Sequence, residues 1–432
     1  MTQLWQWKDK LLKNPFIRSL SVLMAGTALT NLIIVLTTPL LTRLYTPEDF
    51  GVYSVFLSLL FTGTILVSLR YETAIPLPED EDEAFHLLVL SIILAFIVSA
   101  LLCILFFFIP ISQLLNVPEL ETYMWMLSLS LLGIGIFQAF NSWALRDEQY
   151  MMISKAKMTM NSSQIASQLS LGLFQLGLPG LLIGEIIGRM TGSLDYFRLI
   201  KRTHKAVYKI SAKSLVKVLI GYKSYPIVSS WAALINSLGT QMPIFYLAAH
   251  FDAKTAGWFF LAQKILTIPE GLIGFSASQV YLSQAAQTAR NSQEHFRQFF
   301  WDTVKKMIVI GFIIIGLVAL CAPLAIKIVF GEQWIQAAEF IQILSVLYFM
   351  KIIINPISAN FYVFNALGKQ FISELIRFIL ICVSLFLALE FFVTPTTSLL
   401  CISLVSATGY LIHGIFAWST IKEYKSEEIK HD

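Results

Sequence analysis

Two long apolar runs joined by a short polar turn lie between residues 31 and 86. The first run ends near Arg43, and the second extends from Phe50 to Arg70. Each run is about 20 residues long, which is enough to cross the ~30 Å hydrocarbon layer of a bilayer as a helix. The turn between them, 46–49, is too short to form a domain. This stretch therefore predicts a membrane-spanning helical hairpin with cations near its ends.

Composition extends this prediction to the whole chain. Of the 432 residues, 56% are hydrophobic and 13% are charged, whereas a soluble domain carries about 25% charged residues. Most of the surface is therefore expected to face lipid, where the backbone must form helices or a closed barrel. Barrel strands alternate in polarity over ~10 residues, and the apolar runs here are unbroken over longer stretches. The sequence predicts an all-α polytopic membrane protein.

Twelve apolar spans can be drawn, with boundaries expected to hold within ~4 residues. Span five is the least hydrophobic because it contains several Ser, Asn and Gln residues, so it is expected to face protein or a water-filled cavity rather than lipid. The spans lie at 19–42, 50–71, 84–109, 120–143, 155–176, 178–199, 224–249, 255–282, 304–329, 338–363, 371–392 and 396–419.

The second half of the chain resembles the first. Asn31 is followed by a Pro, a short acidic turn and a Gly beside an aromatic residue, and the same order follows Asn236. A repeat at that separation indicates duplicated halves, a construction that is common in transporters. We therefore expect an N-terminal lobe (1–200) with helices one to six after a short interfacial segment, a basic cytoplasmic linker (201–223), and a C-terminal lobe (224–432) with helices seven to twelve and a cytoplasmic tail.

The distribution of Lys and Arg among the loops predicts the orientation. Most of these residues, including a cluster between 198 and 223, fall in alternate loops, and the intervening loops hold Arg43, Lys254 and Lys327. Cytoplasmic loops carry the excess of positive charge in membrane proteins. Both termini are therefore expected in the cytoplasm. Because the cations are dispersed among loops, the net charge of +4 gives no indication of nucleic-acid binding.

Signatures of catalysis are absent from the sequence. It contains no Walker loop, no zinc-type histidine spacing and no GxSxG elbow, so we expect neither an enzyme nor a metal or cofactor. Of the scattered histidines, His413 lies well within a span. A lone histidine in an apolar helix is more often a hydrogen-bonded packing residue than a proton relay.

Charges within the spans are the stronger functional signal, because each is unfavourable in lipid and usually faces a cavity or a partner. Glu185 and Arg189 are spaced i, i+4 and are expected to pair on one helix face, as a structural pair or as a coupling site. Glu270 is a further coupling candidate. Glu374 and Arg377, spaced i, i+3, are expected to pair in the same way.

Lys264 and Lys351 differ, since neither has a carboxylate three or four residues away. A cation at the position of Lys264 is unfavourable unless an anion or water reaches it. Arg70 closes the corresponding helix of the first half. Two cations on equivalent helices, facing one cleft, would bind a phosphate-bearing substrate, and a snorkelling interfacial position is the alternative for Arg70.

Several motifs resemble one known family. The runs LLTRLYTPEDFGVYS (40–54) and LRYETAIPLP (69–78) resemble the start of the polysaccharide-biosynthesis flippases of the multidrug/oligosaccharidyl-lipid/polysaccharide exporter superfamily. LRDEQY (145–150) resembles that family's loop after span four, and Lys264 followed by Pro269 resembles its eighth span. The resemblance implies about twelve transmembrane helices in two six-helix lobes that form a V-shaped central cavity, with alternating access.

The resemblance also implies a cargo and a location. The cargo would be a polyprenyl-pyrophosphate-linked oligosaccharide, moved from the inner to the outer leaflet of a bacterial or archaeal cytoplasmic membrane for surface polysaccharides such as the O-antigen of lipopolysaccharide. Expected partners are this lipid-linked oligosaccharide, membrane lipid and other glycan-assembly membrane proteins, with no nucleic acid. The substrate-binding candidates are Arg70, Lys264, Arg43, Asn31, Asn236, Gln263 and Lys351.

Other functions remain open at this stage. A cation-coupled multidrug exporter of the same fold would need a membrane-embedded carboxylate, for which Glu185 or Glu270 could serve. An integral-membrane glycan polymerase or ligase is the enzyme alternative, and the short outer loops argue against it. A scaffold for a glycan-assembly complex is a third alternative.

Overall fold

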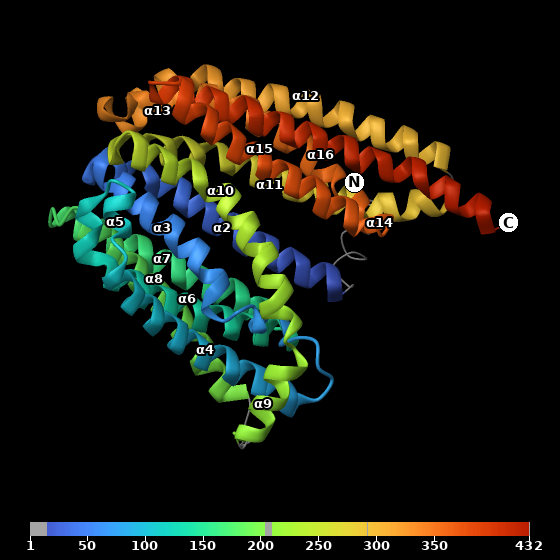
Figure 1. Cartoon of the computed structure of the whole chain (residues 1–432), viewed down its shortest axis with the longest axis horizontal. Helices are drawn as coiled ribbons and strands as arrows, with labels where there is room; N and C mark the ends of the chain where they lie inside the picture. The colour runs from blue at the N-terminus through green and yellow to red at the C-terminus, as the bar shows by residue number, and fades with distance from the viewer. Residues whose placement is uncertain (1–14, 204–209, 292, 432) are drawn as a thin grey trace, which may run out of the picture. The chain divides into compact units, whose positions relative to one another are not determined.

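The computed structural model describes residues 15–203, 210–291 and 293–431 (Figure 1). All regular elements in these ranges are helical, which confirms the predicted all-α class. The first 14 residues of the expected N-terminal interfacial segment lie outside the described residues.

Twelve long helices in the described residues correspond one for one to the twelve predicted spans. They are α2 (Pro15–Leu44), α3 (Pro47–Val67), α4 (Glu81–Phe108), α6 (Met124–Arg146), α7 (Tyr150–Leu173), α8 (Leu178–Thr203), α10 (Ser230–His250), α11 (Ala253–Asn291), α12 (Gln293–Ala325), α13 (Ile335–Ile357), α15 (Leu367–Phe391) and α16 (Pro395–His431). The shorter elements are α5 (Ile111–Leu114), α9 (Ala212–Gly221), α14 (Asn360–Val363), the 3-10 turns η1 (Tyr71–Ala74), η2 (Pro118–Tyr123) and η5 (Glu332–Trp334), and the π-turns η3 (Tyr225–Ser229) and η4 (Ile326–Phe330).

Seven helical segments in the described residues are long and apolar enough to cross a membrane, judged by length and composition. A shorter apolar helix covers Leu29–Leu44. The polar helix α7 is not among the seven, in line with its low predicted hydrophobicity. The seven are Pro47–Val67, Glu81–Phe106, Pro118–Arg146, Glu294–Phe330, Glu332–Val363, Leu367–Phe391 and Pro395–Ile421.

Three helices extend well beyond the boundaries predicted from hydropathy. α11 ends at Asn291 rather than at residue 282, α12 begins at Gln293 rather than at 304, and α16 ends at His431 rather than at 419. The predicted ends mark where polar or charged residues begin, and a helix continues past that point when those residues are good helix formers. Hydropathy therefore locates the apolar part of each helix, but it does not locate the residues at which the helical backbone hydrogen bonds end.

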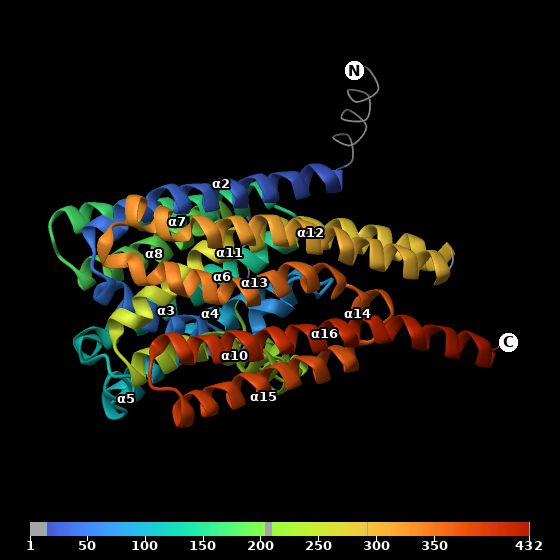
Figure 2. The ribbon, with the colours of Figure 1, turned by 90° about the horizontal axis from the view of Figure 1, so that it is seen from above.

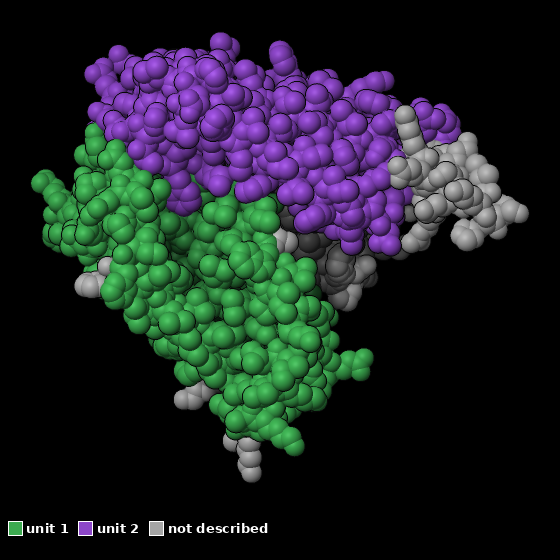
Figure 3. Space-filling model, in the orientation of Figure 1, with its two compact units in different colours: residues 1–241 green, residues 242–432 purple. Residues whose placement is uncertain are grey.

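The chain divides into two compact units, residues 1–241 and 242–432, with the boundary inside α10 (Figure 3). In unit 1, α7 lies against α2 and α8, and α6 lies against α4 and α8. In unit 2, α13 contacts α11, α12 and α16. Figure 2 shows α15 and α16 running side by side. The lobe boundaries expected at residues 200 and 224 stay a prediction. The linker between them contains α9, and its residues 204–209 lie outside the described part.

The turn of the first hairpin follows directly from its sequence. The Thr46 hydroxyl accepts a hydrogen bond from the backbone N–H of Asp49 (3.1 Å), and the Asp49 carboxylate accepts one from the N–H of Thr46 (3.0 Å). This reciprocal cap, with Pro47 in the first helical turn, starts α3. Buried Tyr45 donates to the carbonyl of Gln168 (2.6 Å) and so ties the turn to α7. Burial, and then Asp49, raise the pKa of Tyr45 to about 12, so it remains a neutral donor.

Glycines spaced by four residues allow α8 to approach α7 closely. A Cβ at Gly188 would lie 2.7 Å from the Cβ of Gln164 and 2.9 Å from the carbonyl oxygen of Met160. Gly184 and Gly192 are equally crowded. Residues four apart share a helix face, and small residues there let two membrane helices pack backbone to backbone. This contact brings the polar side chains of α7 next to the charged residues of α8.

We predict that Gly188→Ala destabilises the protein by about 1–3 kcal/mol, because the added methyl overlaps a backbone carbonyl that cannot move easily. The matched control is Gly316→Ala in α12, where a Cβ meets nothing within 4 Å. That change should be neutral or should stabilise the helix by up to about 1 kcal/mol. Thermal unfolding of the two purified variants in detergent measures the difference. Equal melting temperatures would contradict the close α7–α8 contact.

Candidate functional site

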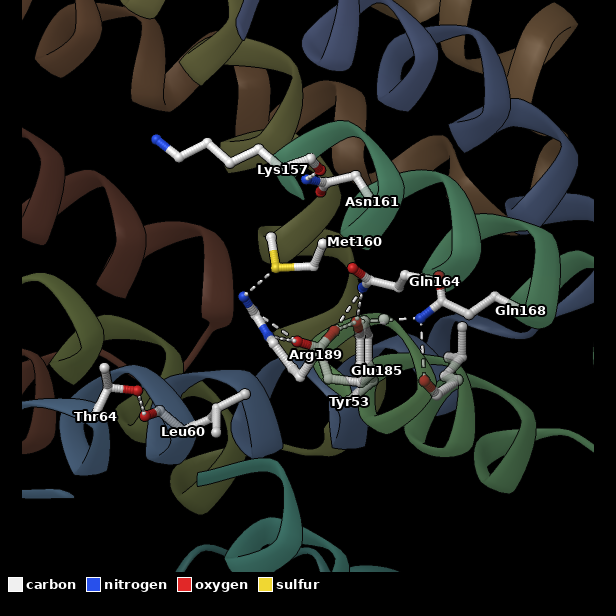
Figure 4. A network of polar contacts seen from close by, with 12 residues as sticks. Tyr53, Leu60, Thr64, Lys157, Met160, Asn161, Gln164, Gln168, Glu185 and Arg189 are labelled. Atoms are coloured by element: carbon white, nitrogen blue, oxygen red, sulfur yellow. Dashed lines mark hydrogen bonds and ion pairs between the residues drawn. The ribbon is translucent and has the colours of Figure 1, made fainter. Parts of the chain in front are cut away.

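An ion pair inside unit 1 is surrounded by side chains of neighbouring helices (Figure 4). Glu185 is 1% exposed, and its Oε1 accepts from Nε (2.8 Å) and Nη2 (2.7 Å) of Arg189, which lies one turn further along α8. Its Oε2 accepts from the hydroxyl of Tyr53 (2.7 Å) and from Nε2 of Gln164 (2.5 Å). The structure thus brings Glu185 and Arg189 together in the predicted i, i+4 pair.

The partners of this pair come from two other helices, α3 and α7. The Tyr53 hydroxyl, on α3, also accepts from Nε2 of Gln164 (3.1 Å) and of Gln168 (3.2 Å), both on α7. Gln168 Nε2 donates further to the carbonyl of Leu181 on α8 (3.0 Å). A buried carboxylate is tolerated only when a counter-charge and hydrogen bonds satisfy it. The network satisfies both oxygens of Glu185 and joins α3, α7 and α8.

Tyr53, Gln164 and Gln168 were absent from the candidates named in the sequence. The unusual polarity of span five could have indicated Gln164 and Gln168, because a glutamine in a membrane helix needs hydrogen-bond partners. The partners themselves are more than 100 positions away from Tyr53 along the chain, so spacing could not reveal them.

A cavity of about 710 Å³ runs along one face of α7. Its lining combines hydroxyls, one lysine and two methionines, at intervals of three and four residues. The Ser163 hydroxyl also hydrogen-bonds that of Thr191 on α8, two residues beyond Arg189. Span five therefore faces both protein and a cavity, as its composition predicts. The lining residues are Met151, Ser154, Lys155, Met158, Thr159, Ser162 and Ser163.

Arg70 lies in a left-handed turn of the backbone just after α3. Leu69 (φ 50°) and Arg70 (φ 64°) are both left-handed, and η1 begins immediately afterwards. The Arg70 Nε is buried and has no hydrogen-bond partner among the described residues. Buried Glu72 accepts from the Ser68 hydroxyl (2.5 Å). Burial raises the pKa of the Glu72 carboxyl, and Ser68 and Arg70 offset part of that rise.

A second turn, in the LRDEQY segment (145–150), holds this segment in place. Arg146, in LRDEQY, donates through Nη1 to the carbonyl of Pro78 and through Nη2 to the carbonyl of Glu79 (3.2 Å). Two segments that carry the family resemblance, 69–78 and 145–150, therefore meet in the structure. From the sequence, Arg146 was placed in a loop that carries the resemblance, and these contacts were not predicted.

Lys264 and Lys351, in unit 2, lie over aromatic rings. Lys264 Nζ is 5.9 Å from the ring centre of Phe260, one turn earlier on α11, and Lys351 Nζ is 4.4 Å from that of Tyr348. Glu270, on α11, interacts electrostatically with Lys351 and accepts from Nδ2 of Asn355 (2.9 Å). Lys351 thus has a carboxylate nearby that local spacing could not show.

The predicted Glu374–Arg377 pair is wrong. The Arg377 guanidinium lies 3.9 Å from the ring centre of Tyr410 on α16, and Glu374 instead accepts from Nε2 of Gln370 (3.1 Å). A flat guanidinium stacks well on a tyrosine face within a bundle, and Gln370 is the i−4 neighbour of Glu374. Both groups therefore find other partners.

His413 is a packing residue, as expected. It is 4% exposed, and its ring nitrogens contact the hydroxyls of Ser373 (Nδ1, 2.9 Å) and Ser358 (Nε2, 3.1 Å). The Phe361 ring centre lies 5.0 Å from the imidazole. These contacts give both nitrogens a partner and fix the junction of α13, α15 and α16.

The remaining substrate candidates are partly or fully accessible. Arg43 is exposed in the last turn of α2, Asn31 is half-buried on the same helix, and Asn236 is exposed on α10. Gln263 is half-buried beside Lys264. The substrate-binding role of Arg70, Lys264, Arg43, Asn31, Asn236, Gln263 and Lys351 stays a prediction.

The family described as "Polysaccharide biosynthesis protein" matches residues 40–339. The chain belongs to this family. The matched range contains all the segments on which the resemblance in the sequence rests. A curated relative, "Teichuronic acid biosynthesis protein TuaB" of Bacillus subtilis (strain 168), is 28% identical over 126 residues. That match covers 28% of this chain and 25% of the relative's length.

Solved structures show the same fold for this family member. "Lipid II flippase MurJ, inward closed conformation" matches with a TM-score of 0.68 and 16% identity, over 93% of this chain and 87% of that one. An inward-facing multidrug resistance MATE family transporter of the MOP superfamily matches with a TM-score of 0.70 and 14% identity, over 92% of this chain and 99% of that one. The chain is a multi-pass membrane protein with the fold of transporters and flippases.

We predict that Arg189→Ala destabilises the protein by about 3–5 kcal/mol, because it leaves the Glu185 carboxylate buried without its counter-charge. Adding Glu185→Gln should restore much of the loss, since the buried charge is then removed as well. Thermal unfolding of both single variants and the double variant gives the coupling energy. The control is Arg198→Ala, whose exposed 3.9 Å pair with Asp195 is worth at most about 1 kcal/mol. A stable Arg189→Ala variant would contradict the role of the pair.

Glu72 should make stability depend on pH. Because its pKa in the folded protein is raised, its stabilising contribution is present below the ordinary carboxyl value of 4.5 and is lost as pH rises through the raised value. Glu72→Gln is therefore expected to melt at a higher temperature than the parent at pH 7, with the difference shrinking toward pH 4. Melting curves in detergent across this range test it, with exposed Glu79→Gln as the control. A Glu72→Gln variant that is less stable at every pH would show that the Ser68 bond to the charged carboxylate dominates.

Proposed function

We propose that this chain is a flippase that moves a polyprenyl-pyrophosphate-linked oligosaccharide from the inner to the outer leaflet of the cytoplasmic membrane by alternating access. The family supports the polysaccharide part of this proposal, and the fold shared with a lipid II flippase supports the lipid-linked part. The product would be a surface polysaccharide, of which the O-antigen of lipopolysaccharide is one candidate.

The contacts made by two carboxylates within the predicted spans, Glu185 and Glu270, favour this function over cation-coupled drug export. A coupling carboxylate must be able to bind and release a proton or a sodium ion. Glu185 already receives four donor contacts, two of them from Arg189. Glu270 accepts from Asn355 and lies in the field of Lys351. Carboxylates engaged in this way are poor sites for an exchanging cation.

The cations within the helices suit an anionic cargo. Lys264 and Lys351 lie over aromatic rings, as does Arg377, and such contacts leave the positive charge in place. We propose that Arg70 and Lys264 bind the pyrophosphate and that Arg43 acts in gating or release. Asn31, Asn236, Gln263 and Lys351 would contact other parts of the cargo.

The decisive measurement is leaflet transfer by the full-length protein in proteoliposomes. Vesicles would contain a fluorescent polyprenyl-pyrophosphate-linked oligosaccharide, and an impermeant quencher would report the fraction in the outer leaflet. Lys264→Ala should slow transfer by about 10- to 100-fold, the loss expected for one charge-assisted contact, whereas Lys264→Arg should stay close to the parent. The control is Lys327→Ala, which removes an exposed lysine paired with Glu332 (3.2 Å).

Two results would overturn the proposal. One is normal transfer by Lys264→Ala at equal protein level, which would remove Lys264 from the site. The other is gradient-dependent efflux of a cationic dye without any transfer of the lipid-linked sugar, which would establish the drug-exporter alternative. Cells lacking the chain provide an independent check, because they should accumulate the lipid-linked unit and lose the surface glycan.

A further inference from the structure

The short helix α9 docks on one end of unit 1. Its inward face buries Val218 (2% exposed) against the cluster that contains Tyr71 and Leu87. Figure 1 shows α9 beside one end of α4. Three hydrogen bonds attach it to η1 and to the first turns of α4. They join the Tyr71 hydroxyl to the carbonyl of Leu219 (2.8 Å), the Tyr222 hydroxyl to Oε1 of Glu83 (3.0 Å), and the N–H of Ser211 to Nε2 of His86 (3.3 Å).

These bonds attach α9 to the segment that carries Arg70. Tyr71 follows Arg70 directly, and Arg146 holds the far end of the same segment through Pro78 and Glu79. Burial, and then the bond to Glu83, raise the pKa of Tyr222 to about 12, so this residue remains a neutral donor at physiological pH. A force on α9 is therefore transmitted to the backbone next to Arg70.

The outward face of α9 is apolar and is bordered by lysines. Val216, Leu219 and Ile220 are 52%, 39% and 59% exposed, and their spacing places them on one side of the helix. Lys213 and Lys217 are exposed on the adjoining side. This combination of an apolar edge and a basic edge is typical of helices that lie in the interface of an anionic membrane.

The position of α9 along the spans agrees with an interfacial location. Trp231 is 62% exposed in the first turn of α10, which follows α9 after one π-turn. Exposed tryptophan is enriched at the level of the lipid headgroups. On the other side, α9 contacts α4 beside its acidic first turn, Glu81–Glu83. Both neighbours are therefore at a helix end, where the hydrocarbon layer meets water.

We propose that α9 binds the inner-leaflet surface and thereby holds the Arg70 segment in place. Val216, Leu219 and Ile220 enter the boundary of the acyl chains, and Lys213 and Lys217 bind the headgroups of anionic phospholipids. A helix of 10 residues is unstable alone in water, so the membrane on one face and unit 1 on the other jointly stabilise it. This proposal rests on the membrane location of the chain and does not require the proposed cargo.

Lipid quenching of a probe on α9 tests the binding without any measurement of transport. Ile220→Cys would be made in a full-length protein whose four native cysteines are replaced, labelled with an environment-sensitive dye and reconstituted in vesicles containing brominated acyl chains. We expect stronger quenching in vesicles with 30% phosphatidylglycerol than in pure phosphatidylcholine, and a decrease in high salt. Gly221→Cys is the matched control, because residue 221 is exposed and lies about 100° around the helix from residue 220, away from the apolar edge, so a probe there should be quenched less.

Charge variants identify the residues that bind the headgroups. Lys213→Gln with Lys217→Gln should weaken the association of α9 with anionic vesicles by about fivefold for each lysine, whereas the two Lys→Arg changes should preserve it. Lys305→Gln with Lys306→Gln, on exposed positions of α12, should leave quenching at residue 220 unchanged. Equal quenching in neutral and anionic vesicles would overturn the headgroup assignment. A probe that is shielded from water but unquenched in both would indicate a protein partner or a second copy, and would overturn the proposal.

Amide hydrogen exchange tests the connection to Arg70. Anionic lipid should slow exchange of residues 68–79 in the parent, because α9 then holds Tyr71 more firmly. Tyr71→Phe removes the hydroxyl that bonds Leu219 and should abolish this lipid effect while leaving the quenching at residue 220 in place. Exchange that is independent of lipid in the parent would overturn the connection.

Discussion

The carboxylate of Glu185 lies inside unit 1 with almost no contact with solvent, and the surrounding helices provide everything that makes this position tolerable. An ionised carboxyl group in an apolar interior must receive a counter-charge and enough donors to replace its water. α8 supplies the counter-charge through Arg189, α3 supplies Tyr53, and α7 supplies Gln164. The glycines of α8 are needed as well. Side chains at these positions would hold α7 too far away for the amides of Gln164 and Gln168 to reach Glu185 and Tyr53.

Unit 2 also holds charged side chains within its helices, and it places them against aromatic rings. Its cations Lys351 and Arg377 rest on the faces of Tyr348 and Tyr410. An aromatic face attracts a cation without neutralising it, and Lys351 also interacts with the carboxylate of Glu270. Unit 1, in contrast, cancels the charge of its buried carboxylate locally. The two units therefore stabilise their charged side chains in different ways, unit 1 with a direct ion pair and unit 2 with tyrosine faces.

Much of the fold was predictable because it depends on local sequence. Twelve apolar runs predicted the twelve long helices of the described residues, and the i, i+4 spacing of Glu185 and Arg189 predicted their contact. The capping of α3 by Thr46 and Asp49 was not predicted, since residues 46–49 were expected to form a turn. The missed contacts join residues that are distant along the chain, such as Glu270 near Lys351. Glu374 and Arg377 show the limit of spacing rules, because a tyrosine on another helix competed for the guanidinium.

The lengths of α11 and α12 have a mechanical consequence. At 1.5 Å per residue, the 39 residues of α11 extend for roughly 58 Å and the 33 of α12 for about 50 Å, against about 30 Å of hydrocarbon. The two helices contact each other, so a pair of this length that stands across a bilayer would form a joint projection beyond it. A small change of tilt inside the membrane becomes a larger displacement at the tip of such a lever. The projection is therefore a natural place to attach a binding protein or a spectroscopic label that reports the motion of unit 2.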